Sequence, residues 1–217
     1  IKTTMKDRQL MIFSATINEK TLSIAKNIMK NPETIKIENK ETVNPNITHI
    51  YILSEQRDKI ETLRKLINAI NPKKSIVFIN KSEEIDIITS KLKYHKLKAD
   101  GIYGSAVKKE RQKALEEFKK GKVQLLVASD LAARGLDIKD ITHIFNLDLP
   151  ENPKEYLHRV GRTGRSGKEG TAISIVTKKE LALINKYKKI FNIKIEEKDV
   201  YKGKIVAPVV RKNKFKA

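Results

Sequence analysis

The sequence lacks cysteine and tryptophan entirely, and only 6% of its 217 residues are aromatic. Without cysteine, disulfide bonds and thiolate metal sites are excluded, and we expect no metal site of this kind. With so few aromatic residues, a platform that stacks nucleic-acid bases is not expected. No apolar run approaches the length of a membrane span, and no signal peptide is visible. We therefore expect a soluble cytoplasmic protein with no membrane partner.

Two sequence patterns that hold phosphate groups and magnesium are also missing. The chain contains no Gly-x-x-x-x-Gly-Lys-Ser/Thr loop and no Asp-Glu-Ala-Asp run. These elements bind the ATP phosphates and the metal ion in P-loop enzymes. The chain opens on Ile1 rather than methionine, and a segment as short as residues 1–38 cannot close a core by itself. We interpret the sequence as a fragment, or as a protein that lacks its first half.

Positive charge is what the chain has in excess. Its 46 lysines and arginines outnumber 26 aspartates and glutamates, which gives a net charge of +20. Such a charge favours a polyanionic partner. A proteome with lysine-rich protein surfaces is the alternative explanation, because the lysines are scattered as well as clustered.

The stretch Tyr156–Arg165 combines three arginines with two glycines. Just before it, Asn152 at the N-cap, Pro153 at the first helical position and Glu155 form the pattern of a capping box, which predicts a helix start. Arginine is planar, permanently charged and bidentate toward phosphate oxygens, so the stretch suits a polyphosphate. A solvated basic helix end is the alternative.

Spacing within this stretch predicts how its cationic groups are arranged. Arg159 and Arg162 are three residues apart and should share one helical face. Gly161 and Gly164 weaken the helix and should end it near these residues, which places Arg165 at its C-terminal end.

Apolar patterns along the chain predict an α/β fold with a parallel sheet covered by helices on both faces. Residues 1–38 should contain a helix at 19–29 between strands at 9–13 and 34–37. Residues 39–46 are polar and read as a linker between domains. A second domain should span residues 47–201, followed by a basic tail at 202–217. The tail is a disordered end, an extra RNA tether or the start of a truncated accessory region. Within the second domain we expect strands at 47–53, 75–79, 102–103, 123–128, 141–147 and 171–176, and the strand at 171–176 should be the last. We expect helices from Ser54 to Ile70, from Ser82 onward, at 108–121 and at 179–191.

Polar residues follow several of these predicted strands. Ligands of such sheets bind beyond the carboxyl ends of the strands, and a glycine followed by a helix start lets a phosphate approach free backbone N–H groups. The alternative for Ser105 and Ser82 is plain helix capping. The residues that suit a sugar-phosphate backbone are Asn80, Lys81, Gly104, Ser105, Arg111 and Ser129.

Three segments carry a resemblance to a known family. Ser14-Ala15-Thr16, the run VASDLAARGLDI at residues 127–138 and HRVGRTGR at residues 158–165 resemble motifs III, V and VI of the superfamily 2 helicases of the DEAD-box class. Their order and spacing agree with that family, and the resemblance extends from about Gln9 to about Val200. It implies that the chain is the second of two RecA-like domains, with a remnant of the first at residues 1–38.

The resemblance also implies roles at the ATP side. Arg162 and Arg165 correspond to catalytic arginine fingers that act on the γ-phosphate of a nucleotide held by the other domain. Asp137 and Gly135 correspond to ATP-binding residues, with Asp137 accepting a hydrogen bond from the ribose; a plain turn aspartate is the alternative. Residues that would couple the two domains are Ser14, Ala15, Thr16, Arg134, His158 and Arg159, among which His158 could instead be a structural histidine and Arg134 should order motif V through Asp137.

On the RNA side, the resemblance implies that the strand-end residues contact phosphates and 2′-hydroxyl groups. Two positions depart from the family, since Lys108 stands where glutamine is usual and Lys81 where threonine is frequent. Both substitutions keep or add positive charge, so phosphate binding should survive while the hydrogen-bond detail is in doubt.

Taken together, the sequence predicts the C-terminal half of an ATP-dependent RNA helicase, which is inactive alone. The expected ligands are RNA, ATP and magnesium, the latter two bound mainly by a first RecA-like domain of the same protein, and we expect a monomer. Two alternatives remain open: a non-enzymatic RNA-binding module, and a DNA-directed superfamily 2 helicase domain.

Overall fold

The computed structural model of the chain describes residues 9–13, 19–35, 43–102, 108–133 and 138–208. The chain forms two compact units, Ile1–Lys40 and Glu41–Ala217. In the first unit, helix α1 (Glu19–Ile28) occupies the stretch predicted to be an amphipathic helix. None of the helices in the described ranges is long and apolar enough to cross a membrane.

The two strands predicted in the first unit are not formed in its described part. Residues 9–13 and 34–35 have no regular structure, and residues 36–37 lie outside the described ranges. Their apolar side chains remain in solvent, with Phe13 90% and Ile35 83% exposed. A strand needs a neighbouring strand to satisfy its backbone groups, and the described residues of this unit provide none. Apolar pattern alone was therefore misleading here.

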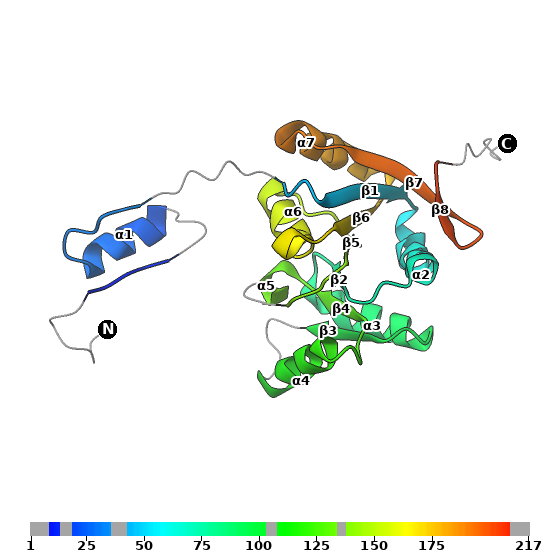
Figure 1. Ribbon diagram of the computed structural model, residues 1–217, viewed down its shortest axis with the longest axis horizontal. Coiled ribbons are helices and arrows are strands. Elements are labelled where there is room, and N and C mark those ends of the chain that lie inside the picture. Colours follow the sequence, from blue (N-terminus) through cyan, green and yellow to red (C-terminus); the bar gives the residue numbers. More distant parts are fainter. Residues whose placement is uncertain (1–8, 14–18, 36–42, 103–107, 134–137, 209–217) are drawn as a thin grey trace. The chain divides into compact units, whose positions relative to one another are not determined.

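The second unit is built around one sheet of eight strands in the order β3-β4-β2-β5-β6-β1-β7-β8 (Figure 1). Neighbouring strands from β3 to β7 are parallel, and β8 runs antiparallel to β7. The strands are β1 (Ile47–Leu53), β2 (Ser75–Phe78), β3 (Ala99–Ile102), β4 (Leu125–Ala128), β5 (His143–Asn146), β6 (Gly170–Val176), β7 (Ile195–Tyr201) and β8 (Lys204–Val206).

Helices cover both faces of this sheet, as predicted (Figure 1). Because successive strand residues point to opposite faces, Val77 of β2 packs with α2 and α3, whereas Phe78 packs with α4 and α5. Helices α6 and α7 pack on the second of these faces over β1 and β6. This is the RecA-like α/β arrangement predicted from the sequence. The helices are α2 (Lys59–Ile70), α3 (Ile85–Tyr94), α4 (Lys108–Lys119), α5 (Asp130–Ala133), α6 (Pro153–Val160) and α7 (Leu181–Phe191).

The prediction that β6 is the last strand was wrong. Strands β7 and β8 follow α7, and β8 lies within the segment predicted to be a basic tail. β7 has the sequence Ile-Glu-Glu-Lys-Asp-Val-Tyr and most of its residues are only half-buried. It has no apolar alternation to mark it, and it forms because β1 offers it an open edge for pairing.

Side-chain capping was predicted at the start of three helices, and the structure shows it at one of them. Asn152 caps α6 by accepting a hydrogen bond from the backbone N–H of Lys154 at 3.0 Å, and Pro153 is the first helical residue. Ser54 does not cap α2, since its hydroxyl pairs with that of Thr62 and a short 3-10 turn (Gln56–Asp58) precedes the helix. Ser82 begins a 3-10 turn (Ser82–Glu84) that has no side-chain cap.

Candidate functional site

The predicted gathering of polar residues at the carboxyl ends of neighbouring strands is present in the second unit. Asn80 follows β2, Ser129 follows β4 and Asp148 follows β5. The backbone N–H of Asn80 donates to the Asp148 carboxylate at 3.1 Å. The Ser82 hydroxyl donates to that of Ser129 at 3.0 Å. Direct hydrogen bonds therefore join β2 to β5 and β2 to β4 at this edge, which we call the carboxyl rim.

Arg159, which was predicted to couple to another domain, lies inside the second unit. Its side chain is 1% exposed. Nε and Nη2 donate to the two carboxylate oxygens of Asp130 at 2.7 and 2.5 Å, and Nη1 donates to the Asp148 carbonyl at 2.7 Å. The guanidinium also lies over the Phe78 ring, 5.2 Å from its centroid. Helical spacing places Arg159 on the α6 face that packs on the sheet, so it serves the unit's own interior.

Asn80 uses both ends of its side-chain amide within the unit. Its Nδ2 donates to the Leu149 carbonyl at 2.9 Å, and its Oδ1 accepts from Nη2 of Arg159 at 2.8 Å. An amide held in this way has a fixed orientation, and its polar atoms are already engaged. The side chain therefore orders the carboxyl rim, whatever else the residue contacts.

The other described residues predicted to face RNA differ in accessibility. Lys81 extends from the carboxyl rim with its side chain 73% exposed and forms an ion pair with Glu84 at 3.3 Å. Ser129 is buried. Arg111, on α4, donates to the carbonyl of Ala132 at 2.9 Å and so ties α4 to the end of α5. Among these three, Lys81 presents the most accessible charge.

The segment after α6 presents Arg162 and Arg165 from a firmly anchored base. α6 ends at Val160, as the glycines predict, and Gly161 is its C-cap. Thr163, between the two arginines, is buried and donates to the Ile141 carbonyl at 2.6 Å. Arg165 Nε donates to the Gly161 carbonyl at 3.0 Å. The side chains of Arg162 and Arg165 thus extend from backbone positions on either side of Thr163, which is held in place by burial and a hydrogen bond.

Gly164 completes this anchoring in a way that only glycine allows. Its φ is +67°, and a Cβ atom there would lie 2.7 Å from Cγ1 of Ile47. Its carbonyl accepts a hydrogen bond from the Asn44 side chain at 2.5 Å. The left-handed conformation and the close approach of β1 both exclude a side chain.

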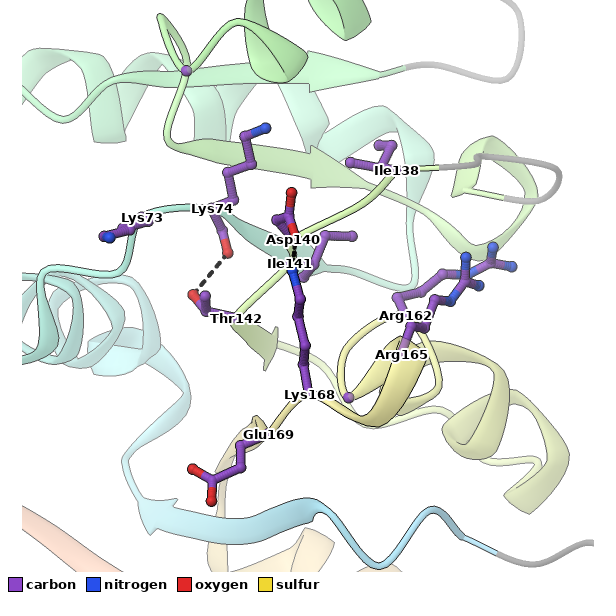
Figure 2. Close-up of a pocket in the computed structure, with 12 residues that line it drawn as sticks. Lys73, Lys74, Ile138, Asp140, Ile141, Thr142, Arg162, Arg165, Lys168 and Glu169 are labelled. Carbon is purple, nitrogen blue, oxygen red and sulfur yellow. Dashed lines mark hydrogen bonds and ion pairs between the residues drawn. The ribbon is translucent and has the colours of Figure 1, made fainter.

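A basic cavity of about 550 Å³ runs beside this segment. Figure 2 shows Arg162 and Arg165 next to each other with their guanidinium groups pointing the same way, away from the Lys168–Asp140 pair. Lys168 Nζ is 2.5 Å from the Asp140 carboxylate. Burial, and after it the nearby charge of Arg165, lower the pKa of the Arg162 guanidinium. Two crowded cations at the edge of a basic cavity favour an anionic ligand. The charged lining residues are Lys73, Lys74, Asp140, Arg162, Arg165, Lys168 and Glu169.

Arg162 also connects this cavity with the carboxyl rim, since it lines a small hollow together with Phe78, Asp130 and His158. His158 itself is exposed. The sequence interpretation assigned no site role to Asp130 or Asp148, although each is an acidic residue that closely follows an apolar strand. That pattern was available as a signal for a cation partner at the carboxyl rim.

Eight predicted site residues lie outside the described ranges. They are Ser14, Ala15 and Thr16, Gly104 and Ser105, and Arg134, Gly135 and Asp137.

Comparison with known proteins gives consistent results. The sequence model of the family described as "Helicase conserved C-terminal domain" matches residues 58–167. The chain is 37% identical over 206 residues to the DEAD-box ATP-dependent RNA helicase CshC of Bacillus cereus, covering 95% of the chain and 52% of CshC. It is 38% identical over 178 residues to CshA of Bacillus subtilis, covering 82% of the chain and 36% of CshA. The chain thus spans about half, or less, of the length of these relatives.

The fold has similar solved structures as well. One is S. cerevisiae Dbp5 bound to RNA and ADP BeF3, with a TM-score of 0.78 and 29% sequence identity. That similarity covers 92% of the chain and 53% of Dbp5.

Proposed function

Because the chain belongs to the helicase conserved C-terminal domain family and is the C-terminal RecA-like domain of the DEAD-box class, we propose that it supplies two arginine fingers and part of an RNA-backbone site to an RNA-stimulated ATPase. The fingers are Arg162 and Arg165. Residues 1–38 are then a remnant of the first RecA-like domain, residues 39–46 the linker, and residues 202–217 the end of this domain together with its basic tail.

The observation that carries the proposal is the anchored base of the two arginines. Thr163 bonded to Ile141 and Gly164 bonded to Asn44 fix the backbone from which both guanidinium groups extend. Negative charge builds on the phosphoryl oxygens in the transition state of ATP hydrolysis, and cationic donors held in place beforehand stabilise it without reorganisation. Arginines on a loosely held loop would lose much of that advantage.

At the carboxyl rim, the proposed RNA contacts are phosphate and sugar contacts. Lys81 extends from the carboxyl rim, Ser129 directly follows β4, Arg111 lies on α4, and Gly104 and Ser105 complete the set by resemblance. Asn80 contributes by ordering the backbone beside Lys81. Such contacts bind any RNA sequence, and their affinity falls steeply with salt.

ATP and its magnesium ion are bound mainly by the first RecA-like domain in this proposal, with Gly135 and Asp137 added from this chain. In this proposal His158, Arg159 and Arg134 are the coupling residues of this domain, and Ser14, Ala15 and Thr16 are those of the remnant of the first. Because the sequence has neither a Gly-x-x-x-x-Gly-Lys-Ser/Thr loop nor an Asp-Glu-Ala-Asp run, the chain alone should not hydrolyse ATP.

A chimaera tests the proposal: the N-terminal half of Bacillus subtilis CshA is placed before this chain, and RNA-stimulated ATP turnover is measured. Arg162→Ala and Arg165→Ala should each lower kcat by about 10³-fold or more, with little change in the KM for ATP, because the lost interaction is made in the transition state. The matched control is Arg64→Ala. The Arg64 side chain lies on the surface of α2 and donates a hydrogen bond to Glu61 of the same helix.

Two results would contradict this assignment. A large rise in KM with unchanged kcat would make the arginines ground-state binding residues. A chimaera that binds RNA but never hydrolyses ATP would favour the non-enzymatic RNA-binding module.

A further inference from the structure

Charged side chains of alternating sign run along the carboxyl rim of the second unit. Two buried cations, Arg159 and Lys59, alternate with three carboxylates from different elements. In spatial order the members are Asp130 after β4, Arg159 of α6, Asp148 after β5, Lys59 of α2 and Glu180 before α7. Arg159 contacts Asp148 through the main-chain carbonyl, whereas the other neighbours in this order are ion pairs. Asn80, after β2, bridges Arg159 and Asp148.

The Arg159 end of this network joins the two halves of the proposed site. Arg159 lies three residues before Arg162, in the helix whose end carries the fingers. Its partner Asp130 lies directly after Ser129 and is the first residue of α5. The bidentate bond of Arg159 to Asp130, at 2.7 and 2.5 Å, therefore ties the finger segment to the strand end proposed to contact RNA.

The Lys59 end has a different task. Lys59 Nζ is 2.9 Å from Glu180 and donates to the Leu147 carbonyl at 3.1 Å. Burial alone would raise the pKa of the Glu180 carboxyl, but hydrogen bonds from Thr177 and Lys59 outweigh it and lower that pKa. Glu180 also closes a capping box with Thr177. This end fastens α2 and α7 to the sheet and touches neither finger.

We propose that Asp130 is a positioning residue that holds Arg159, and through it the finger segment, in register with the RNA-contacting carboxyl rim. This inference rests on the proposed function. It assigns Asp130 a role in transmitting the presence of bound RNA to the arginine fingers. This role is separate from the effect that a buried ion pair has on the stability of the fold.

The geometry favours a role in alignment over one in stability alone. A buried ion pair contributes little net stability compared with apolar packing, but it fixes the relative placement of its partners because a misaligned pair leaves a buried charge unsatisfied. A bidentate arginine–carboxylate bond is also directional. Asparagine at residue 130 would keep the size and one acceptor but lose the charge and the second acceptor.

The test uses the same chimaera with Asp130→Asn, and Glu180→Gln as the matched control. Both substitutions neutralise one carboxylate of the same network, so both should lower Tm by a few degrees. Asp130→Asn should lower RNA-stimulated kcat about 10-fold and reduce the ratio of stimulated to unstimulated turnover. The KM for ATP and the affinity for RNA, measured by fluorescence anisotropy, should stay within about two-fold. Glu180→Gln should leave kcat and that ratio within about two-fold.

The outcomes separate this inference from the proposed function. Equal losses of kcat in the two variants, or an unchanged stimulation ratio in Asp130→Asn, would reduce Asp130 to a structural residue. Arg162→Ala would still lower turnover in that case. If Arg162→Ala itself has no effect on turnover, the finger assignment fails independently of Asp130.

Discussion

His49 is a buried histidine with one hydrogen-bond partner among the residues that the structure describes. Its Nδ1 lies 2.8 Å from the Tyr156 hydroxyl, and its Nε2 is buried without a partner among the described residues. Burial lowers the pKa of His49 to about 4. The folded protein therefore keeps this ring neutral at pH values where the unfolded chain is already protonated.

The free energy of unfolding should consequently fall as the pH is lowered from the pKa of His49 in the unfolded chain to its pKa in the folded chain. The unfolded chain gains a proton at His49 near pH 6.5, and the folded chain only near pH 4. In that window the unfolded state binds more protons, so the free energy of unfolding decreases by about 3 kcal/mol from pH 7 to pH 4 on account of His49. In urea unfolding, His49→Phe should show a pH dependence smaller by about that amount.

The comparison between variants isolates this residue from other groups. Burial also lowers the pKa of His143, which acts in the same direction and is retained in both proteins. An identical loss of stability in wild type and His49→Phe would mean that the fold accommodates the charged ring.

At the scale of the element, α6 shows how a few residues place a functional segment. Asn152 accepts from Lys154, Pro153 opens the helix and Gly161 closes it, so the chain reaches the anchored Thr163 at a defined angle. Asn152→Ala removes the acceptor and should lower the free energy of unfolding by about 1 kcal/mol. Denaturant unfolding checks this value, and Asn152→Ser, which retains a capping oxygen, should remain near wild type. Equal stability of the alanine and serine variants would argue against the cap.

Strand β7 shows the opposite case, where an element exists because of its neighbour. Its charged sequence has little in common with the continuous apolar runs of β2 and β4, which are buried on both faces. The first unit presents the reverse situation, since residues 10–13 are apolar but irregular. In both places the pairing edge, rather than the side-chain pattern, decided whether a strand formed.

At the scale of the whole molecule, the net charge of +20 predicts RNA binding that depends strongly on salt. Each phosphate contact to a single strand contributes about 0.7 to the slope of log K against log salt. Lys81→Ala, at the carboxyl end of β2, should reduce that slope by roughly 0.7 in anisotropy titrations with single-stranded RNA. Lys65→Ala, on the exposed surface of α2 and not among the residues that line the basic cavity, should leave it unchanged. Equal effects of the two substitutions would indicate a diffuse charge effect without a defined site.

The sequence by itself determined the class of fold, the order of most elements and the position of α6. Continuous apolar runs mark buried parallel strands, and the cap and glycine residues around α6 act locally, so both can be read without knowledge of the partners. The motif residues likewise placed the candidate site at the carboxyl rim, because the ends of parallel strands meet at one edge.

Only the tertiary structure decided which of those residues face inward. Arg159 and Arg162 look alike in sequence, yet Arg159 is buried against Asp130 and Arg162 lines the cavity. Asp130, Asp148 and Lys59 became partners through contacts between segments far apart in the chain. The physical reason is that an ion pair depends on distance in space and on burial, and neither quantity is recorded in the order of the residues.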